Sequence, residues 1–498
     1  MSTPKDLTAL LHDPALLLVR EMLREAGIRE AYLVGGTVRN LLIRGRLETR
    51  DLDVAIPDDP LVAAEAVAKH LEGAFVPLDE RAVRVVFPGP AIRWQLDVAR
   101  YRGPTIREDL ALRDFTVNAM ATPLVGGVPG ELLDPTGGRA DLAAGIVRHV
   151  FAGAFADDPL RTLRAVRLAA ALNGAIAPET RALIRQAAPS LARVAGERVR
   201  DEVVKIFRSD GVARWARELH DLGLLSVLVP AAEAMEDVLP SPPHRLSLWE
   251  HSLEVLRLLE GLLADPARWF PEDAAEIATR SVEVLEGEIT RRSLLGLFVL
   301  LHDVGKPATR TVDPDGRVRF LGHVEAGAAI LADLAARFRL GRRAADYLDR
   351  MERGHMRPIL LAAEPSVTPR ARYRFFRDLG LVAVDALLHS VADVGGTVGT
   401  EDPAWWARVG FVREMLAFRR ERLRPVQQAP PLTGDEVMAL TGIGPCPLVG
   451  YVLEKVTEAA ALGKLHSPDD CRELVRREFP AWKREYEQSI PPAPCPSG

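Results

Sequence analysis

Tyr32-Leu33-Val34-Gly35-Gly36-Thr37-Val38-Arg39 is followed, after a short basic segment, by Arg50-Asp51-Leu52-Asp53-Val54-Ala55-Ile56. The first stretch predicts a buried strand that breaks at two glycines and leads into a helix carrying an arginine. The second predicts a strand that opens with two carboxylates. Because side chains alternate along a strand, Asp51 and Asp53 share one face, and the apolar residues take the other. The two carboxylates are therefore predicted to lie side by side.

Adjacent carboxylates repel each other unless a cation neutralises them. Enzymes that transfer phosphoryl or nucleotidyl groups hold two Mg²⁺ ions with shared carboxylates. Gly35 and Gly36 leave backbone N–H groups open, which suits a triphosphate lying at a helix N-terminus. Either feature alone is more often a simple turn or strand end, but their order along the chain favours a nucleotide site.

This arrangement resembles the head of the nucleotidyltransferase superfamily that includes DNA polymerase β. It resembles more closely the bacterial-type branch that holds the CCA-adding tRNA nucleotidyltransferases and poly(A) polymerases. The resemblance implies that Asp51 and Asp53 are catalytic and hold Mg²⁺. It also implies that Gly35, Gly36 and Arg39 contact the triphosphate. Asn40 stands where the family commonly has Asp.

Length and composition describe an ordinary globular chain. Its 498 residues predict three or four domains, and its 48% hydrophobic and 27% charged content is typical of soluble proteins. No run approaches the ~18 apolar residues of a membrane span, and the N-terminus has no export pattern. Three widely spaced cysteines, Cys446, Cys471 and Cys495, favour reduced thiols. We therefore expect a cytoplasmic protein that does not bind membranes.

The fold class predicted is α+β for a head over residues 1–150. Residues 5–29 favour one or two amphipathic helices, and 61–71 favour another. Strands are expected around 74–77, 83–87 and 94–99, giving a small mixed sheet with helices on it. Asp97 is placed to be a third acidic residue near the metals, although an outward-facing strand carboxylate explains it equally well.

A second motif runs from Glu108 to Ala121 in the sequence Glu-Asp-Leu-Ala-Leu-Arg-Asp-Phe-Thr-Val-Asn-Ala-Met-Ala. It resembles the family motif that has two arginines before Asp-Phe-Thr, but Leu112 replaces the first arginine here. The resemblance implies that Asp109, Arg113 and Asn118 face the triphosphate and sugar.

A helical neck is expected over residues 151–240. Asp157-Asp158-Pro159-Leu160-Arg161 resembles the motif with which CCA-adding enzymes select the incoming base. On one helical turn Asp158 and Arg161 would point the same way and pair with the Watson–Crick edge of cytosine or adenine. Arg164 continues this basic side. The net charge of −5 does not argue against RNA binding, because arginines gather locally between residues 161 and 208.

The Pro-rich stretch at 240–243 predicts a junction before a third domain over residues 241–400. There His251, His302-Asp303 and Asp393 resemble the ligand set of HD metal phosphohydrolases, and His323 and His355 suggest a second ion. Histidine and aspartate together suit a divalent transition metal. Residues 401–498 predict a helical tail resembling the one that follows the HD region in several CCA-adding enzymes.

The expected partners are the 3′ end and acceptor stem of tRNA, with CTP and ATP as substrates. Full CCA-adding relatives carry a long flexible loop between the Asp97 strand and the second motif, whereas about ten residues separate them here. This short form favours a CC-adding enzyme. The alternatives are a complete CCA-adding enzyme, a poly(A) polymerase, an HD phosphohydrolase acting on RNA ends, and a non-enzymatic RNA-binding protein.

Overall fold

The computed structural model describes residues 13–47, 51–70, 73–87, 94–239, 245–428, 431–465 and 467–489. These residues form two compact units, divided between Pro230 and Ala231. The junction predicted at 240–243, the start of the helix predicted from residue 5, and Cys495 lie outside the described residues. The division falls before the predicted boundary at 240.

The head is built on a six-stranded sheet with the order β3-β4-β5-β2-β1-β6. Strands β2 and β5 run parallel, and the other neighbouring strands are antiparallel, which confirms the predicted mixed sheet. In β2 the residues that alternate with the two aspartates, Leu52 and Val54, are buried. The strands are β1 (Ala31–Val34), β2 (Asp51–Ile56), β3 (Ala74–Asp79), β4 (Ala82–Phe87), β5 (Trp94–Arg100) and β6 (Ala121–Val125).

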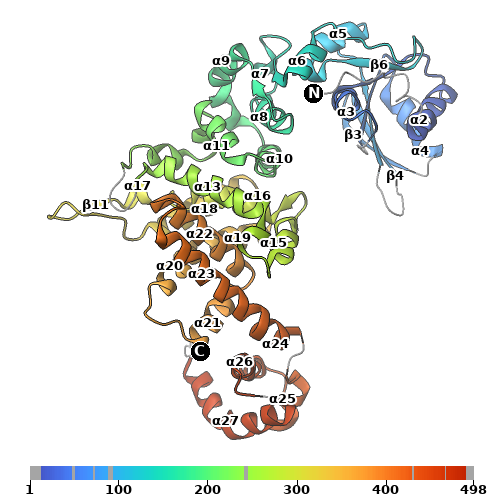
Figure 1. The fold of residues 1–498 in the computed structure, drawn as a ribbon. Helices are drawn as coiled ribbons and strands as arrows, with labels where there is room; N and C mark the ends of the chain where they lie inside the picture. Colours follow the sequence, from blue (N-terminus) through green and yellow to red (C-terminus); the bar gives the residue numbers. More distant parts are fainter. Residues whose placement is uncertain are drawn as a thin grey trace, which may run out of the picture. The chain divides into compact units, whose positions relative to one another are not determined.

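Helices cover the sheet and place its loops. Figure 1 shows α2 and α4 beside the strands, and α4 packs on β3, β4 and β5. Thr105 begins α5 with a capping box, in which its N–H and hydroxyl bond Glu108. The head helices are α2 (Pro14–Glu25), α3 (Gly35–Arg44), α4 (Pro60–His70), α5 (Ile106–Ala111) and α6 (Gly138–Ala144), with a 3₁₀ turn η1 (Thr116–Asn118).

The neck follows the head within the same unit. A short parallel ribbon of β7 (Ile146–Val147) and β8 (Ala175–Ile176) accompanies its helices. Helix α8 packs on α10 and α11. The neck helices are α7 (Ala154–Asp157), α8 (Arg161–Ala171), α9 (Pro178–Ala187), α10 (Gly196–Phe207), α11 (Val212–Asp221) and α12 (Leu224–Leu228), with the 3₁₀ turn η2 (Ala188–Arg193). The 3₁₀ turn η3 (Pro230–Met235) begins at the last residue of this unit and continues into the second.

The second unit is almost entirely helical. The long helices α13 and α22 pack together, and α18 packs on α19 (Figure 1). Two short hairpins, β9–β10 and β11–β12, depart from the helical pattern. Its elements up to residue 428 are α13 (Leu248–Ala264), α14 (Pro266–Trp269), α15 (Ala274–Ser281), β9 (Val284–Glu286), β10 (Ile289–Thr290), α16 (Arg291–Leu301), α17 (Lys306–Thr309), β11 (Thr311–Val312), β12 (Val318–Arg319), α18 (His323–Arg337), α19 (Arg342–Gly354), α20 (Arg357–Ala362), α21 (Pro369–Leu379), η4 (Gly380–Val382), α22 (Ala383–Val398), α23 (Pro403–Phe418), η5 (Arg419–Leu423) and α24 (Arg424–Gln428).

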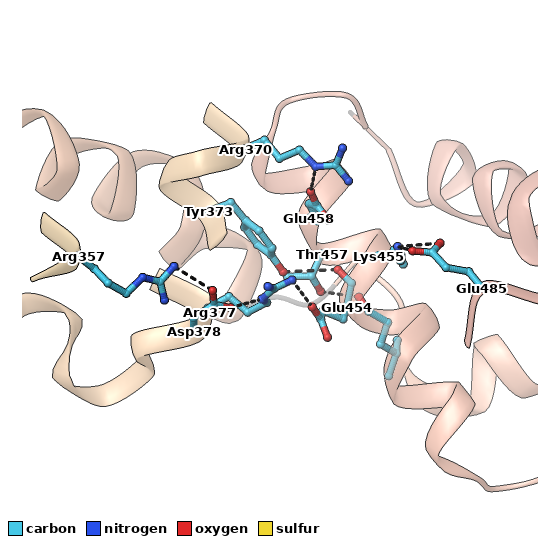
Figure 2. Close-up of polar contacts among 11 residues, drawn as sticks. Arg357, Arg370, Tyr373, Arg377, Asp378, Glu454, Lys455, Thr457, Glu458 and Glu485 are labelled. Atoms are coloured by element: carbon cyan, nitrogen blue, oxygen red, sulfur yellow. Dashed lines mark hydrogen bonds and ion pairs between the residues drawn. The ribbon is translucent and has the colours of Figure 1, made fainter. Parts of the chain in front are cut away.

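The tail comprises α25 (Gly434–Thr441), α26 (Pro447–Ala461) and α27 (Pro468–Ser489) around a small apolar core. Polar contacts join α26 to α21, as Figure 2 shows. Arg370 Nε donates to Glu458 Oε1 at 2.7 Å, and Arg377 Nη1 donates to Glu454 Oε1 at 3.0 Å. The helical tail is therefore attached by ion pairs as well as by chain connectivity.

One stretch of the described chain, Pro369–Val398, is long and apolar enough to cross a membrane by length and composition. It contains α21 and α22, and 72% of its apolar window is buried inside the fold. Core helices of soluble proteins share this property.

Candidate active site

The head carboxylates meet where β2 and β5 lie side by side. Asp53 stands opposite Asp97 in the parallel register. Arg84 on β4 forks onto Asp97, with Nε 2.7 Å from Oδ1 and Nη2 2.8 Å from Oδ2. Asp51, one pleat earlier, is exposed. Burial raises the pKa of Asp53 above its usual value, and the neighbouring charge of Asp97 acts in the same direction.

The two glycines form the wall facing Asp53. Gly35 has a φ of +62°, a backbone conformation that favours glycine. A Cβ on Gly35 would lie 3.2 Å from both Asp53 Oδ2 and Arg113 Nη1, and one on Gly36 would lie 3.4 Å from the same oxygen. The missing side chains therefore leave open space between the start of α3 and the carboxylate.

Arg39 is held by two amides. Its Nη1 donates to Asn118 Oδ1 at 2.5 Å, and its Nη2 donates to Asn40 Oδ1 at 3.0 Å. Burial lowers the pKa of Arg39 to about 10, with the like charge of Arg167 adding to the effect. Asn40, the departure from the usual Asp, thus orients Arg39 without neutralising it.

Two further arginines are paired with carboxylates. Arg113 Nη2 lies 2.9 Å from Asp109 Oδ2, four residues earlier. Arg164 Nη2, from the neck, lies 2.8 Å from Asp114 Oδ2, while Asn118 donates to the other oxygen of Asp114. Burial opposes the charge of Asp114, but Arg164 and Asn118 outweigh it and hold its pKa below the usual value.

The residues predicted to select the base, Asp158 and Arg161, differ from the prediction in one respect. Asp158 is not on a helical turn with Arg161: its backbone is extended, with φ −144° and ψ 101°, and α8 begins only at Arg161. Pro159 explains the break, because the residue before proline avoids helical conformation. Asp158 instead accepts from the N–H of Leu160 and from Arg198 Nη2. Arg161 is buried and donates to the Ala154 carbonyl at 2.9 Å.

One cavity of about 270 Å³ collects most of these residues. Both glycines, Asp53, Asp97 and the second-motif residues line it, together with the three neck residues singled out in the sequence. Arg39 is not among the lining residues but donates to Asn118, which is, and Asp51 lies at the exposed end of β2. Sequence reasoning missed three lining residues: Asp114, Arg100 and Arg102. The lining residues are Val34, Gly35, Gly36, Asp53, Val54, Asp97, Ala99, Arg100, Arg102, Asp109, Arg113, Asp114, Asn118, Asp158, Arg161 and Arg164.

This arrangement suits a magnesium nucleotide. Asp51, Asp53 and Asp97 carry carboxylate oxygens, the ligands that Mg²⁺ prefers, and Arg84 bonds both oxygens of Asp97. The glycine wall leaves room beside Asp53, and arginine guanidinium groups in the same cavity lining supply positive charge. The residues present therefore fit a cation and a polyanionic ligand together.

A second site lies in the helical unit, where His251, His302 and Asp393 bring one ligand atom each within 4.8 Å of one another. His251 Nε2 lies 3.0 Å from Asp393 Oδ1, although the two residues are far apart in sequence. His302 donates from Nδ1 to the Val299 carbonyl at 2.8 Å, which turns Nε2 toward the cluster. Three different helices or helix ends thus supply the set.

Asp303, His323 and His355 form an adjoining cluster with the same spacing. His323 and His355 each donate from Nδ1 to a backbone carbonyl three residues earlier. Their Nε2 atoms are buried without hydrogen-bond partners among the described residues. Burial lowers the pKa of His355 to about 4, so its imidazole is neutral and able to bind a metal. The orphaned nitrogens show that the residues present fit a transition metal.

Sequence reasoning missed two buried residues beside these clusters. His389, one turn before Asp393 on α22, has its ring centroid 4.8 Å from that of His302. Glu352 is fully buried, and desolvation raises its pKa to about 9. Single residues of these types carry no motif, so only the packing of α19 and α22 shows where they lie.

Three models of known protein families match successive parts of the chain. The model of the poly A polymerase head domain matches residues 31–148. That of the probable RNA and SrmB-binding site of polymerase A matches residues 175–236, and the HD domain matches residues 248–394.

Relatives match over nearly the whole chain. The A-adding tRNA nucleotidyltransferase of Deinococcus radiodurans is 34% identical over 461 residues, covering 90% of this chain and 95% of the relative. The CC-adding tRNA nucleotidyltransferase of Thermus thermophilus is 34% identical over 457 residues, covering 90% and 93%. The chain is thus equally similar to enzymes named for different additions.

Solved structures share the fold at lower identity. A CCA-adding enzyme in complex with ATP superposes with a TM-score of 0.62 at 22% identity, covering 96% of this chain and 98% of that one. The Thermotoga maritima CCA-adding enzyme complexed with tRNA gives 0.61 at 22%, covering 96% and 100%. Together with the extent of the sequence match, this shows that the chain belongs to the family of CCA-adding tRNA nucleotidyltransferases and is a nucleotidyltransferase with an HD domain.

Proposed function

We propose that this enzyme transfers CMP from CTP to the 3′ end of tRNA, adding the two cytidines and leaving the terminal adenosine to another enzyme. The observation that carries the proposal is the single cavity that joins Asp53 and the glycines to the neck residues Asp158 and Arg161. A phosphate-binding end and a base-reading end therefore share one ligand-sized space. The 3′ end and acceptor stem of tRNA are the proposed second substrate, and the proposed location is the cytoplasm.

Each part of the cavity has its own task. Asp51 and Asp53 would hold two Mg²⁺ ions, which when bound lower the pKa of the attacking 3′-hydroxyl and neutralise the leaving phosphates. Gly35, Gly36 and Arg113 bind the triphosphate, and Arg39 fixes Asn118 beside it. Asp158 offers an acceptor and Arg161 and Arg164 offer donors to the base edge, so protein side chains replace a template.

The preference for cytidine rests on the connection between β5 and α5. Only residues 101–105 join them, and Thr105 already caps α5. A connection this short and this constrained leaves no long loop to reshape the pocket for ATP. The CC-adding relatives of Thermus thermophilus and Geobacter sulfurreducens are 34% and 30% identical to this chain.

The test is product length. Purified protein is incubated with Mg²⁺, CTP, ATP or both, and either tRNA lacking its last three nucleotides or tRNA ending in CC, and products are resolved at single-nucleotide resolution. Two additions with CTP and no third with ATP are expected. Three additions would instead establish a complete CCA-adding enzyme, and a single addition of A to tRNA ending in CC would establish an A-adding one.

The matched control is the Asp51→Ala, Asp53→Ala double variant, which should add nothing. Equal nucleotide addition by this variant and the wild type would show that the head carboxylates do not catalyse the reaction. Long adenosine tails on unrelated RNA would favour a poly(A) polymerase.

A second activity is proposed for the helical unit because two adjoining histidine–aspartate clusters meet there. A divalent transition metal bound at these residues would supply a metal-activated water for phosphoester hydrolysis. The expected result is opening of RNA 2′,3′-cyclic phosphates to a 2′- or 3′-phosphomonoester, or release of phosphate from terminal phosphomonoesters. Mn²⁺, Co²⁺ or Ni²⁺ should stimulate the reaction, and His302→Ala should abolish it. Hydrolysis that survives the substitution would exclude this site.

A further inference from the structure

The second motif has leucine at position 112, where the family usually has an arginine, but another arginine, Arg102, lines the cavity. Leu112 stands at the first arginine position, and its side chain is 40% exposed. It does not line the cavity. Position 112 therefore contributes no charge to the site, and only Arg113 remains of the motif's usual arginine pair.

Arg102 reaches this place from the β5–α5 connection. Its backbone N–H donates to Asp109 Oδ1 at 3.1 Å, and its Nη1 donates to the carbonyl oxygen of Leu112 at 2.8 Å. Asp109 also pairs with Arg113. The Asp109 carboxylate thus positions both arginines. The guanidinium of Arg102 contacts the backbone of Leu112, the position where the family usually has an arginine.

The charge of Arg102 is not matched by an ion pair within the described chain. Arg113 and Arg164 are paired with Asp109 and Asp114, whereas the guanidinium of Arg102 bonds a neutral carbonyl. Arg102 is exposed overall, but partial desolvation lowers its pKa, and the like charges of Arg113 and Arg161 act in the same direction against Asp109 and Asp114. Cations gathered in this way attract an anionic ligand, and a guanidinium fork matches phosphate oxygens.

We propose that Arg102 binds the triphosphate of the incoming nucleotide and supplies the positive charge that position 112 lacks. This assignment rests on the proposed function of the cavity and deepens it. The phosphates are the chosen target because Asp158 and Arg161 already present an acceptor and donors to the base. Arg102 lies in the short connection between β5 and α5, residues 101–105, which replaces the long loop of full CCA-adding relatives.

The experiment compares binding of CTP, CDP and CMP by calorimetric titration of the full chain in Mg²⁺ without tRNA. The variants are Arg102→Gln, which removes the charge, and Arg102→Lys, which keeps it. Arg107→Gln is the matched control, because Arg107 is an exposed arginine in the first turn of α5 outside the cavity. Circular dichroism melts verify that each variant is folded.

Arg102→Gln is expected to weaken CTP binding roughly 10- to 100-fold, the range for a lost charge-assisted hydrogen bond. CMP binding should change by less than about twofold, because a contact to the outer phosphates is absent in CMP. Arg102→Lys should recover most of the CTP affinity, and Arg107→Gln should match the wild type.

Two results overturn the assignment. Wild-type CTP affinity in Arg102→Gln would show that the residue does not touch the nucleotide. Equal losses for CTP and CMP would make it a positioning residue that acts through the Leu112 carbonyl. If the wild type itself binds no CTP, the proposed function fails. If the wild type and Arg102→Gln both bind CTP and add CMP equally well, only the assignment of Arg102 fails.

Discussion

Asp53 carries a negative charge in surroundings that oppose it. Burial and the charge of Asp97 opposite raise its pKa by more than Arg113 and Arg39 lower it, and Arg84 bonds Asp97. An acid whose folded pKa is raised binds more protons when folded than when unfolded, so stability falls as pH rises through the interval between its two pKa values. At neutral pH the charged form of Asp53 therefore lowers the free energy of unfolding, a cost that its proposed role in binding Mg²⁺ would explain.

Asp53→Asn is expected to raise the melting temperature at pH 7 and to abolish nucleotide addition, by roughly a thousandfold or more. The gain in melting temperature should vanish as the pH is lowered below the usual aspartate pKa, because Asp53 is then protonated in both states. Differential scanning calorimetry and primer extension on the same preparations measure both effects. The control Asp58→Asn, an exposed aspartate beyond β2, should change neither. A destabilised Asp53→Asn protein would contradict the electrostatic account.

At the scale of elements, short connections decide what the cavity contains. Pro159 interrupts the α7–α8 segment, so Asp158 enters the cavity from an extended residue rather than from a helix face. The β5–α5 connection does the same for Arg102. Both residues lie where a regular element stops, and there tertiary contacts rather than periodicity set the direction of the side chain.

Asp158→Ala is expected to change the ratio of kcat/KM for CTP over ATP by about tenfold or more, because a site that bonds a base edge loses its discrimination with the bond. Steady-state kinetics on truncated tRNA with each nucleotide measure the ratio. Asp157→Ala is the control, since Asp157 is the exposed neighbour outside the cavity. An unchanged ratio in Asp158→Ala would place base selection elsewhere.

The second prediction at this scale concerns the helix ends that carry histidines. His302→Ala and His355→Ala should each weaken transition-metal binding by at least about 10- to 100-fold, because each removes a nitrogen already oriented by a backbone carbonyl. Metal content after dialysis, measured by mass spectrometry, gives the result. The control is His70→Ala, which changes an exposed histidine of the head and should retain the wild-type metal content. Nucleotide addition should stay at the wild-type rate in both His302→Ala and His355→Ala. Full metal content in His302→Ala would exclude the clusters as ligands.

The whole molecule consists of two compact units with separate sites. The nucleotide cavity is built entirely from the first unit, and both histidine–aspartate clusters are built from the second. Ligands that bind only the folded state stabilise the unit that holds their site.

Calorimetry of the full chain is therefore expected to resolve two unfolding transitions. CTP with Mg²⁺ should raise the midpoint of one, and a transition metal should raise the other. At a ligand concentration 100 times Kd, each shift corresponds to about 2.7 kcal/mol. The Asp51→Ala, Asp53→Ala variant serves as the control that loses the nucleotide-dependent shift alone. A single transition that responds to both ligands would show that the units unfold together.

Local patterns in the sequence determined the strand–Gly-Gly–helix head, the mixed sheet, the helical character of the remainder and the grouping of metal-ligand residue types. These follow from alternation, turn chemistry and periodicity, which act over a few residues. Only the tertiary structure decided which groups face each other. Arg84 with Asp97, Arg164 with Asp114, His389 beside His302, and Arg102 against Leu112 each join different elements. Such pairs depend on how helices and strands pack, and the spacing of residues along the chain does not determine the distance between the two partners of a pair.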